Sequence, residues 1–269
     1  MEKKEMAKPV ILVSNDDGVA AEGVRTLAHA MAPLGEVVVV APHADQSAVS
    51  HAMTLRHPLR LRQYPNWETP HGPIRVYSVD GTPTDAVYMG IHHVLRPRQP
   101  ALVVSGINHG GNLGNEVLYS GTVSAAMEGV LLGVPSAAFS LVADHGFDFA
   151  QAAGFARSLC AKLLTMSLPA DMLLNVNVPK RECTGRFAVT RLGSHAYSRD
   201  VEERKDPRGK SYYWIGGQWV GYETLPGTDC KAVADGHISI TPLRVDQTEK
   251  GLLPWLGELS IEGYSSEKD

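Results

Sequence analysis

The stretch Val10–Gly18, with the sequence VILVSNDDG, decides the fold of this chain. Four apolar residues, three of them β-branched, end abruptly in a polar cluster. An unbroken apolar run of this length is typical of a strand buried on both faces, as in a parallel sheet. The polar cluster then follows the carboxyl end of that strand, which is where open α/β sheets bind their ligands.

Two adjacent carboxylates, Asp16 and Asp17, stand in the polar cluster. Neighbouring negative charges repel each other unless a cation or a proton relieves them, so the pair points to a binding site. Gly18 lets the chain turn away closely from a bound group. Asn, Asp and Gly are also ordinary turn residues, and a turn followed by a helix N-cap explains the same letters.

The bulk composition limits the class of protein. The 269 residues suffice for one large α/β domain, or for a domain with an appendage, and 43% apolar residues supply a core. The net charge of -4 argues against binding to long nucleic acid. Three cysteines without CxxC spacing suggest a reducing compartment. No signal peptide or membrane span is apparent, so a cytoplasmic protein is expected.

Strand and helix patterns alternate along most of the chain. A helix from Glu22 to Leu34 joins the first strand to a second buried strand, Val37–Val40, as in a βαβ crossover. The same periodicities predict an α/β fold with a mostly parallel sheet. Further strands are predicted at 59–62, 74–79, 101–104, 136–141, 173–178 and 237–241, and helices at 82–95, 120–131, 147–164 and 247–256.

Small oxygen-bearing side chains follow three of the predicted strands. The first loop offers Asp16 and Asp17, the second offers Ser47, and the third offers Asn108 and Asn112. Because loops after parallel strands open on the same edge of the sheet, these groups can meet. Their oxygens are hard ligands that suit Mg²⁺, Mn²⁺ or Ca²⁺ rather than zinc.

A predicted helix begins at Ser120, Gly121 and Thr122. A helix N-terminus presents unpaired N–H groups that bind phosphate, and the two hydroxyls can donate as well. His109 lies in the third loop and could act as acid or base, but a solvent-exposed loop histidine is the simpler interpretation. The chain has no GxGxxG, HExxH or GxSxG motif.

The segment from Arg191 to Gly217 differs in character from the rest. It carries many charges, several glycines and the aromatic patch Tyr212, Tyr213 and Trp214. Two interpretations stay open: an extended arm or hairpin that projects from the core and meets a partner, or a long ordinary loop region with a few buried aromatic residues.

Taken together, these motifs closely resemble the SurE family, the stationary-phase survival proteins that act as metal-dependent 5′/3′-nucleotidases. The matching segments run in order through nearly the whole chain. They are SNDDG at 14–18, GTPTD at 81–85, VSGIN at 104–108, GNLG at 111–114, YSGTV at 119–123, AMEG at 126–129 and ISITPL at 238–243.

The resemblance implies a site and an architecture. It implies that Asp16, Asp17, Ser47 and Asn108 hold one divalent metal ion, with Mg²⁺ or Mn²⁺ expected. It places Asn112 and the loop 120–122 at the phosphate. It further implies a three-layer Rossmann-like core over residues 1–190, an oligomerisation arm over 191–228, and a return to the core with a terminal helix over 229–269. Homodimers or homotetramers would result.

The predicted reaction is hydrolysis of nucleoside 5′- and 3′-monophosphates. Asp16 or Asp17 would orient the attacking water or accept its proton, and the sequence leaves that choice open. Asn112 and the helix N-terminus would stabilise the charge on the phosphoryl oxygens. Two alternatives remain: an exopolyphosphatase with incidental activity on nucleotides, and a non-catalytic sensor that binds a nucleotide through a metal ion.

Overall fold

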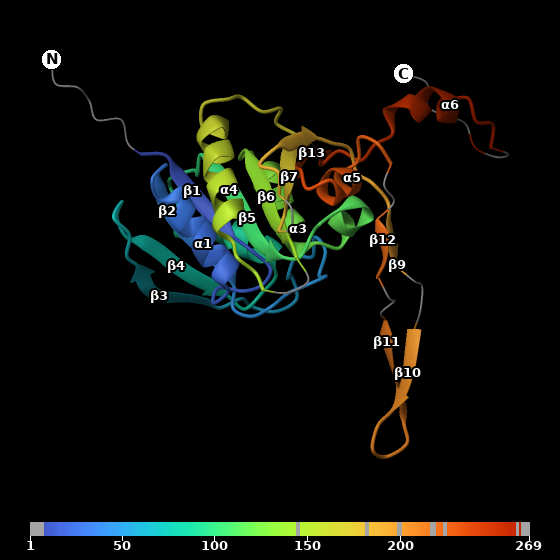
Figure 1. Ribbon diagram of the computed structural model, residues 1–269, viewed down its shortest axis with the longest axis horizontal. Helices are drawn as coiled ribbons and strands as arrows, with labels where there is room; N and C mark the ends of the chain where they lie inside the picture. Colours follow the sequence, from blue (N-terminus) through green and yellow to red (C-terminus); the bar gives the residue numbers. More distant parts are fainter. Residues whose placement is uncertain are drawn as a thin grey trace.

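A central β-sheet organises the chain (Figure 1). The structure, a computed structural model, describes residues 8–143, 146–180, 183–197, 201–215, 219–222, 225–261 and 264. Within these ranges nine strands form one sheet, in the order β3-β4-β2-β1-β5-β6-β7-β13-β8. Their bounds are β1 Val10–Ser14, β2 Glu36–Pro42, β3 Leu61–Trp67, β4 Ile74–Val79, β5 Leu102–His109, β6 Ser136–Val142, β7 Met172–Pro179, β8 Phe187–Val189 and β13 Ile238–Arg244.

The middle of this sheet is parallel, as predicted. Strands β4, β2, β1, β5, β6 and β7 are neighbours in that order and run in one direction. Strands β3 and β13 run antiparallel to β4 and β7. The chain passes from β1 to β2 on one side and later adds β5 on the other side of β1. The carboxyl ends of β1 and β5 therefore flank a topological switch point, where α/β sheets bind ligands.

Helices cover both faces of the sheet and complete the three layers. On one face α1 (Glu22–Met31) packs beside α4 (Ala150–Leu163), and on the other α2 (Pro83–Met89) packs beside α3 (Gly121–Leu131). Figure 1 shows α1 and α4 lying across the sheet on the near side. In the described part of the chain no helix is long and apolar enough to cross a membrane.

The first strand is buried on both faces, as its unbroken apolar run predicts. Ile11 and Val13 pack in one apolar cluster with Leu27 of α1. Leu12 packs in a second cluster with Val87 of α2. Successive side chains of a strand point to opposite faces, so a strand between two helical layers needs apolar residues at every position.

The loop predicted from Ser105 is wrong in its first part, because β5 continues to His109. A register shift between Ser105 and Asn108 marks a bulge against β6. Gly106 permits it: its φ is 117°, and a Cβ there would lie 2.2 Å from the carbonyl oxygen of Phe139. Asn108 and His109 therefore lie on a strand end rather than on a loop.

The helix predicted over 82–95 is split into two pieces. Thr82 caps α2 in a capping box with Asp85. The α-helix ends at Met89, and Gly90–Val94 continue as a π-helical turn, η1. The chain then reaches β5 at Leu102.

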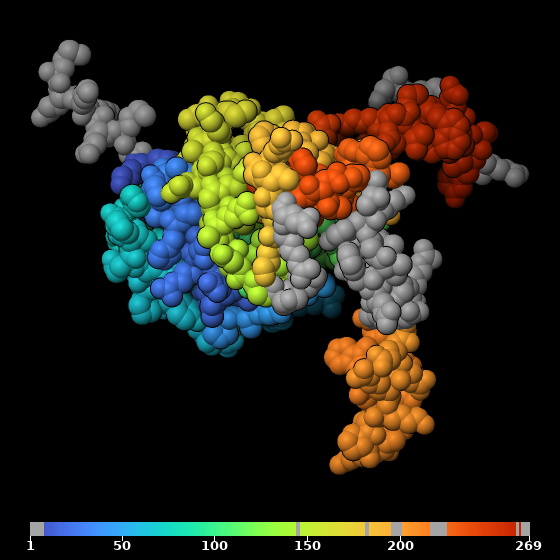
Figure 2. All heavy atoms as spheres, in the orientation of Figure 1, coloured from blue at the N-terminus to red at the C-terminus, as the bar shows by residue number. Residues whose placement is uncertain are grey.

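The helix predicted over 247–256 is wrong in extent. It consists of a 3₁₀ turn, η3 (Lys250–Leu252), and the short helix α6 (Leu253–Gly257). Every residue from 246 to 261 is exposed, so no packed face supports a longer helix. Figure 2 shows this C-terminal segment standing away from the main body. The sequence pattern also does not predict the helix α5 (Asp229–Ala234).

The described parts of 191–228 form an extended double ladder, which supports the arm interpretation over an ordinary loop region. Strand β9 (His195–Tyr197) pairs with β12 (Trp219–Tyr222), and β10 (Val201–Lys205) pairs with β11 (Ser211–Ile215). The hairpin β10–β11 projects from the core (Figures 1 and 2). Residues 198–200, 216–218 and 223–224 of the predicted arm lie outside the described residues. The domain boundaries and the role of the arm in oligomerisation stay predictions.

Leu12→Ala is expected to lower the free energy of unfolding by about 2–5 kcal/mol, because it opens a cavity in a packed core. The matched control is Leu131→Ala on α3, since Leu131 is 56% exposed. Its effect should stay within roughly 0.5 kcal/mol. Urea denaturation followed by circular dichroism measures both. Equal losses in the two variants would contradict the placement of β1 between two helical layers.

Candidate active site

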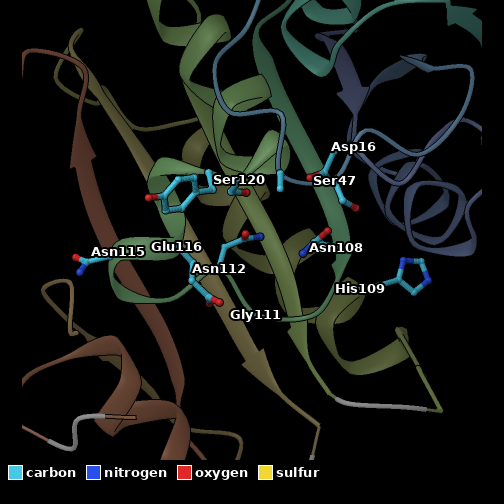
Figure 3. A pocket seen from close by; sticks show the side chains of 11 residues that line it. Asp16, Ser47, Asn108, His109, Gly111, Asn112, Asn115, Glu116 and Ser120 are labelled. Carbon is cyan, nitrogen blue, oxygen red and sulfur yellow. The ribbon is translucent and has the colours of Figure 1, made fainter. Parts of the chain in front are cut away.

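Five predicted site residues line one pocket of about 550 Å³ at the switch point (Figure 3). They are Asp16, Ser47, Asn108, Asn112 and Ser120. They come from the loop after β1, the loop after β2, the end of β5, the loop after β5 and the N-cap of α3. The sheet edge thus brings together groups that lie far apart in the sequence.

Asp16 is the most constrained of these side chains. It is only 4% exposed, and Thr122 donates its hydroxyl proton to one of its carboxylate oxygens. Burial raises the pKa of Asp16 from 3.8 to about 6; the Thr122 hydrogen bond opposes this rise and the neighbouring charge of Asp17 adds to it. A carboxylate in this setting is stabilised by a cation placed beside it.

Gly121 lets α3 begin directly against Asp16. A Cβ at Gly121 would lie 2.7 Å from the Cβ of Asp16 and 2.9 Å from one of its carboxylate oxygens. Any side chain there would push the carboxylate out of place. Position 121 therefore requires glycine for steric reasons.

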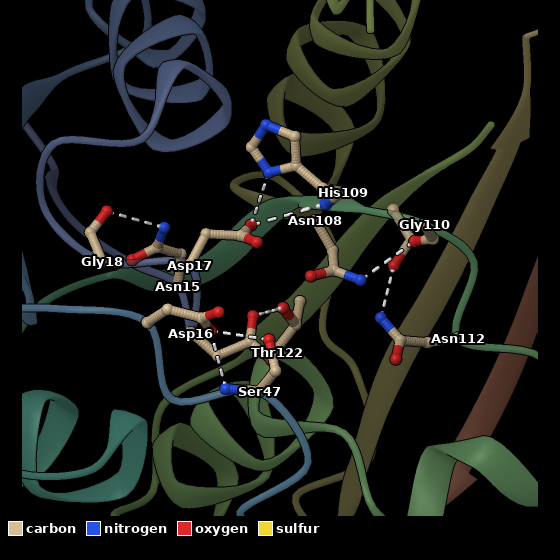
Figure 4. Close-up of polar contacts among 12 residues, drawn as sticks. Asn15, Asp16, Asp17, Gly18, Ser47, Asn108, His109, Gly110, Asn112 and Thr122 are labelled. Atoms are coloured by element: carbon tan, nitrogen blue, oxygen red, sulfur yellow. Dashed lines mark hydrogen bonds and ion pairs between the residues drawn. The ribbon is translucent and has the colours of Figure 1, made fainter. Parts of the chain in front are cut away.

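Asp17 pairs with His109 (Figure 4). Its Oδ2 atom lies 3.0 Å from the Nδ1 atom of His109 and accepts from the backbone N–H of that residue at 3.4 Å. The histidine ring contacts Phe147 and Phe149 edge-on, at centroid distances of 4.8 and 5.0 Å. His109 is exposed, as expected, but it ends β5 and its partner is Asp17, which the sequence does not reveal.

Asn108 and Ser47 offer neutral oxygens to the same space. Asn108 donates through Nδ2 to the carbonyl of Gly110 at 2.9 Å, and its amide oxygen faces the aspartates (Figure 4). Ser47 donates its hydroxyl proton to Asp45 at 2.6 Å, which leaves its lone pairs available.

These oxygens are the donor set that a hard divalent cation requires. Two carboxylates with neutral oxygen ligands match Mg²⁺ or Mn²⁺. In the described ranges no three His, Cys, Asp or Glu side chains gather as metal ligands. An ion at this site would therefore depend on the amide and hydroxyl oxygens as well as on Asp16 and Asp17. Among the features of the site, the buried carboxylate of Asp16 gives the strongest support for a bound cation.

The N-terminus of α3 opens on the pocket. Ser120 caps the helix: its hydroxyl oxygen accepts from the backbone N–H of Val123 at 3.0 Å, and its proton remains for another acceptor. The hydroxyl proton of Thr122 is directed to Asp16 instead. The helix dipole and the free N–H groups of the first turn suit an anion at this position.

Three polar residues next to the pocket are missed by sequence reasoning. Ser140 lies on β6, and Asn175 and Asn177 lie on β7; all three are fully buried and hydrogen-bond to Asn112. The one available signal is two asparagines inside a strand that is otherwise apolar.

The family of the chain follows from comparison with known proteins. The sequence profile of the family described as "Survival protein SurE" matches residues 11–199. The chain belongs to the SurE family. It is 51% identical to the "5′-nucleotidase SurE" of Myxococcus xanthus (strain DK1622) over 256 residues, which cover 95% of both chains. It is 48% identical to the protein of that name from Geotalea daltonii over 241 residues, 88% of this chain and 94% of the relative.

A solved SurE structure has the same fold. The crystal structure of the SurE protein from Aquifex aeolicus superposes with a TM-score of 0.78 at 40% identity. The alignment covers 92% of this chain and 98% of that one. The solved SurE structure and the described part of this chain therefore share the same core.

In metal-free protein, Asp16→Asn is expected to raise the stability at neutral pH. The pKa of Asp16 is 3.8 ordinarily and about 6 in the fold, so the folded state loses stability as the pH rises from 3.8 to 6. The full loss is about 3 kcal/mol at most. Asparagine does not ionise and still accepts the Thr122 hydrogen bond.

Thermal unfolding in the presence of a chelator, at about pH 4 and about pH 7, measures this difference. The variant should gain stability over the wild type only at the higher pH. A variant that is no more stable than the wild type at pH 7 would contradict the buried environment assigned to Asp16.

Proposed function

We propose that this SurE chain is a metal-dependent nucleotidase that hydrolyses nucleoside 5′- and 3′-monophosphates to nucleoside and phosphate. The observation that carries the proposal is the contact between Asp16 and α3: the buried Asp16 receives a hydrogen bond from Thr122 in the first turn of that helix. A cation site and an anion site thus adjoin in one pocket. Relatives about 50% identical over nearly the whole chain carry the name 5′-nucleotidase SurE.

Asp16, Asp17, Ser47 and Asn108 would hold one Mg²⁺ or Mn²⁺ ion per subunit. When bound, such an ion polarises a phosphoryl oxygen and lowers the pKa of a water molecule. The side chains of this set supply two negative charges, which balance a divalent cation. The 16% exposure of the Asp17 side chain keeps it within reach of solvent, whereas Asp16 is buried.

The remaining groups would bind the phosphoryl group, and one of the two aspartates would assist the attacking water. The Ser120 hydroxyl and the N–H groups of the first turn of α3 would donate to the phosphoryl oxygens. The Nδ2 group of Asn112 uses one hydrogen on Ser140 and has a second for the same purpose. Asp16 or Asp17 would orient the attacking water or accept its proton. Both remain candidates for this role.

The subunits would assemble into a homodimer or homotetramer. On the hairpin, Tyr213, Trp214 and Ile215 are 61%, 58% and 93% exposed. At the C-terminal segment, Trp255 is 61% exposed and Leu256 47% exposed. Exposed apolar side chains gathered on projecting elements are typical of an interface between subunits.

A cytoplasmic location completes the proposal. The three cysteines, Cys160, Cys183 and Cys230, are free thiols, as expected in a reducing compartment. Neither a membrane nor a long nucleic acid is a proposed partner. The proposed small-molecule partners are nucleoside monophosphates, with polyphosphate as a further substrate.

Protein stripped of metal by a chelator should release phosphate from AMP only after Mg²⁺ or Mn²⁺ is added back. Asp17→Asn removes one charge from the ion site and should lower kcat by roughly two orders of magnitude or more. Asp235→Asn is the matched control, because its carboxylate is exposed and pairs with Lys231 on α5. Colorimetric phosphate release measures all three proteins.

Near wild-type turnover of Asp17→Asn at saturating metal would contradict the site assignment. Metal-dependent AMP binding with no released phosphate would identify a sensor instead. A higher kcat/KM for polyphosphate than for AMP or 3′-AMP would identify an exopolyphosphatase.

Replacing both Trp214 and Ile215 by glutamate should reduce the oligomeric mass, because two charges would have to be buried in the interface. Leu131→Glu is the matched control, since Leu131 is also exposed but lies on α3 in the core layer. Light scattering coupled to size-exclusion chromatography gives the mass of each. A monomeric wild type, or a double variant of unchanged mass, would rule out the hairpin as an interface.

A further inference from the structure

Asn112 stands on a loop that has little rigidity of its own. The loop connects β5 to the 3₁₀ helix η2 (Gly114–Leu118), and Asn112 follows two glycines in it, Gly110 and Gly111. Gly110 has a φ of 112° and Gly114 a φ of 53°. Glycine gives the unfolded and folded chain more backbone freedom than any other residue. The position of Asn112 must therefore be fixed from outside the loop.

Two asparagines of β7 hold the main chain of Asn112. Asn177 accepts the backbone N–H of Asn112 on Oδ1 at 2.8 Å and donates through Nδ2 to its carbonyl at 3.0 Å. Asn175 donates to the same carbonyl at 2.8 Å. Both side chains are fully buried. Because they are two positions apart on a strand, they point to the same face of the sheet.

The side chain of Asn112 is held from the adjacent strand. Its Nδ2 atom donates to the hydroxyl of Ser140 at 2.7 Å. Ser140 is the register partner of Asn177 on one side and of Asn108 on the other. A row of polar side chains on β5, β6 and β7 thus runs from a proposed metal ligand to the residues that hold Asn112.

The burial of the Asn175 and Asn177 amide groups is unfavourable, so these residues are expected to have a compensating role. Asn175 and Asn177 interrupt a buried strand, where an apolar residue would avoid the loss of hydration. Their hydrogen bonds converge on a single residue of the pocket rather than on the sheet itself. A polar pair whose bonds end on one loop residue acts on the geometry of that residue.

We propose that Asn177 is a positioning residue, which with Asn175 fixes Asn112 so that its side chain meets the phosphoryl group. The inference rests on the proposed function, because Asn112 is assigned to phosphate there. Asn177 touches no substrate and acts only through Asn112. Removal of its amide leaves the pocket intact but allows the loop to depart from the reactive geometry.

Asn177→Ala should lower kcat for AMP roughly 10- to 100-fold, since a displacement of about 1 Å costs a factor of this size. The KM should change by less than about 3-fold if binding is mainly by the ion site and α3. Asn175→Ala removes one of two bonds to the same carbonyl and should lose less. Ser239→Ala is the matched control: Ser239 is the buried register partner of Asn177 on β13, and its hydroxyl has no hydrogen-bond partner among the described residues.

A double-mutant comparison separates positioning from general stability. In an Asn112→Ala background the side chain to be positioned is gone, so Asn177→Ala should cost little further kcat. A merely structural role would cost the same factor in both backgrounds and would overturn the proposal. If Asn177→Ala fails to fold, Asn175→Ala is tested in the same two backgrounds and is interpreted in the same way.

Amide hydrogen exchange tests, independently of turnover, whether Asn177 holds the main chain of Asn112. The backbone N–H of Asn112 is expected to exchange faster in Asn177→Ala than in the wild type and in Ser239→Ala. Unchanged exchange would show that Asn177 does not hold this loop. Absence of phosphate release from the wild type would instead refute the proposed function, whatever the exchange result.

Discussion

The arrangement of the site depends on one unfavourable electrostatic situation, the burial of Asp16 beside Asp17. Burial raises the pKa of Asp16 to about 6, so the fold stabilises the ionised carboxylate less well than water does. Two residues of α3 accommodate this carboxylate: Thr122 donates a hydrogen bond to it, and Gly121 leaves it room. A buried carboxylate that lowers stability at a sheet edge is consistent with the cation site that we propose there.

The sheet topology explains why the participating residues converge. Strands β1 and β5 are neighbours and parallel, although Val13 and its register partner Val104 are 91 positions apart in the sequence (104 − 13). Everything that follows the carboxyl ends of β1, β2 and β5 opens on the same edge. The parallel register of β5, β6 and β7 then places Asn108, Ser140 and Asn177 in one row. The rigid sheet thus supports both the proposed ion site and the proposed phosphate site.

The structural features that depend only on neighbouring residues could be predicted from the sequence. The apolar run of β1 and the carboxylate pair after it could be predicted directly, because each follows from the residue types at consecutive positions. The strand character of Asn108 could not, since it depends on Gly106 packing against the carbonyl of Phe139. The pairing of Asp17 with His109 and the hydrogen bonds of Asn177 to Asn112 could not be predicted either, because they join segments that meet only in the folded sheet. The bounds of the C-terminal helix could not be predicted, because helical spacing alone does not show whether a helix face has anything to pack against.

We propose that Asp16 and Asp17 hold a divalent cation at the switch point between β1 and β5. Anomalous diffraction from crystals grown or soaked with Mn²⁺ tests it most directly, because manganese is located without reference to activity. One strong anomalous peak per subunit is expected, within bonding distance of carboxylate oxygens of both aspartates, with Asn108 and Ser47 beside it. A peak elsewhere on the chain, or none at this edge at millimolar Mn²⁺, would contradict it.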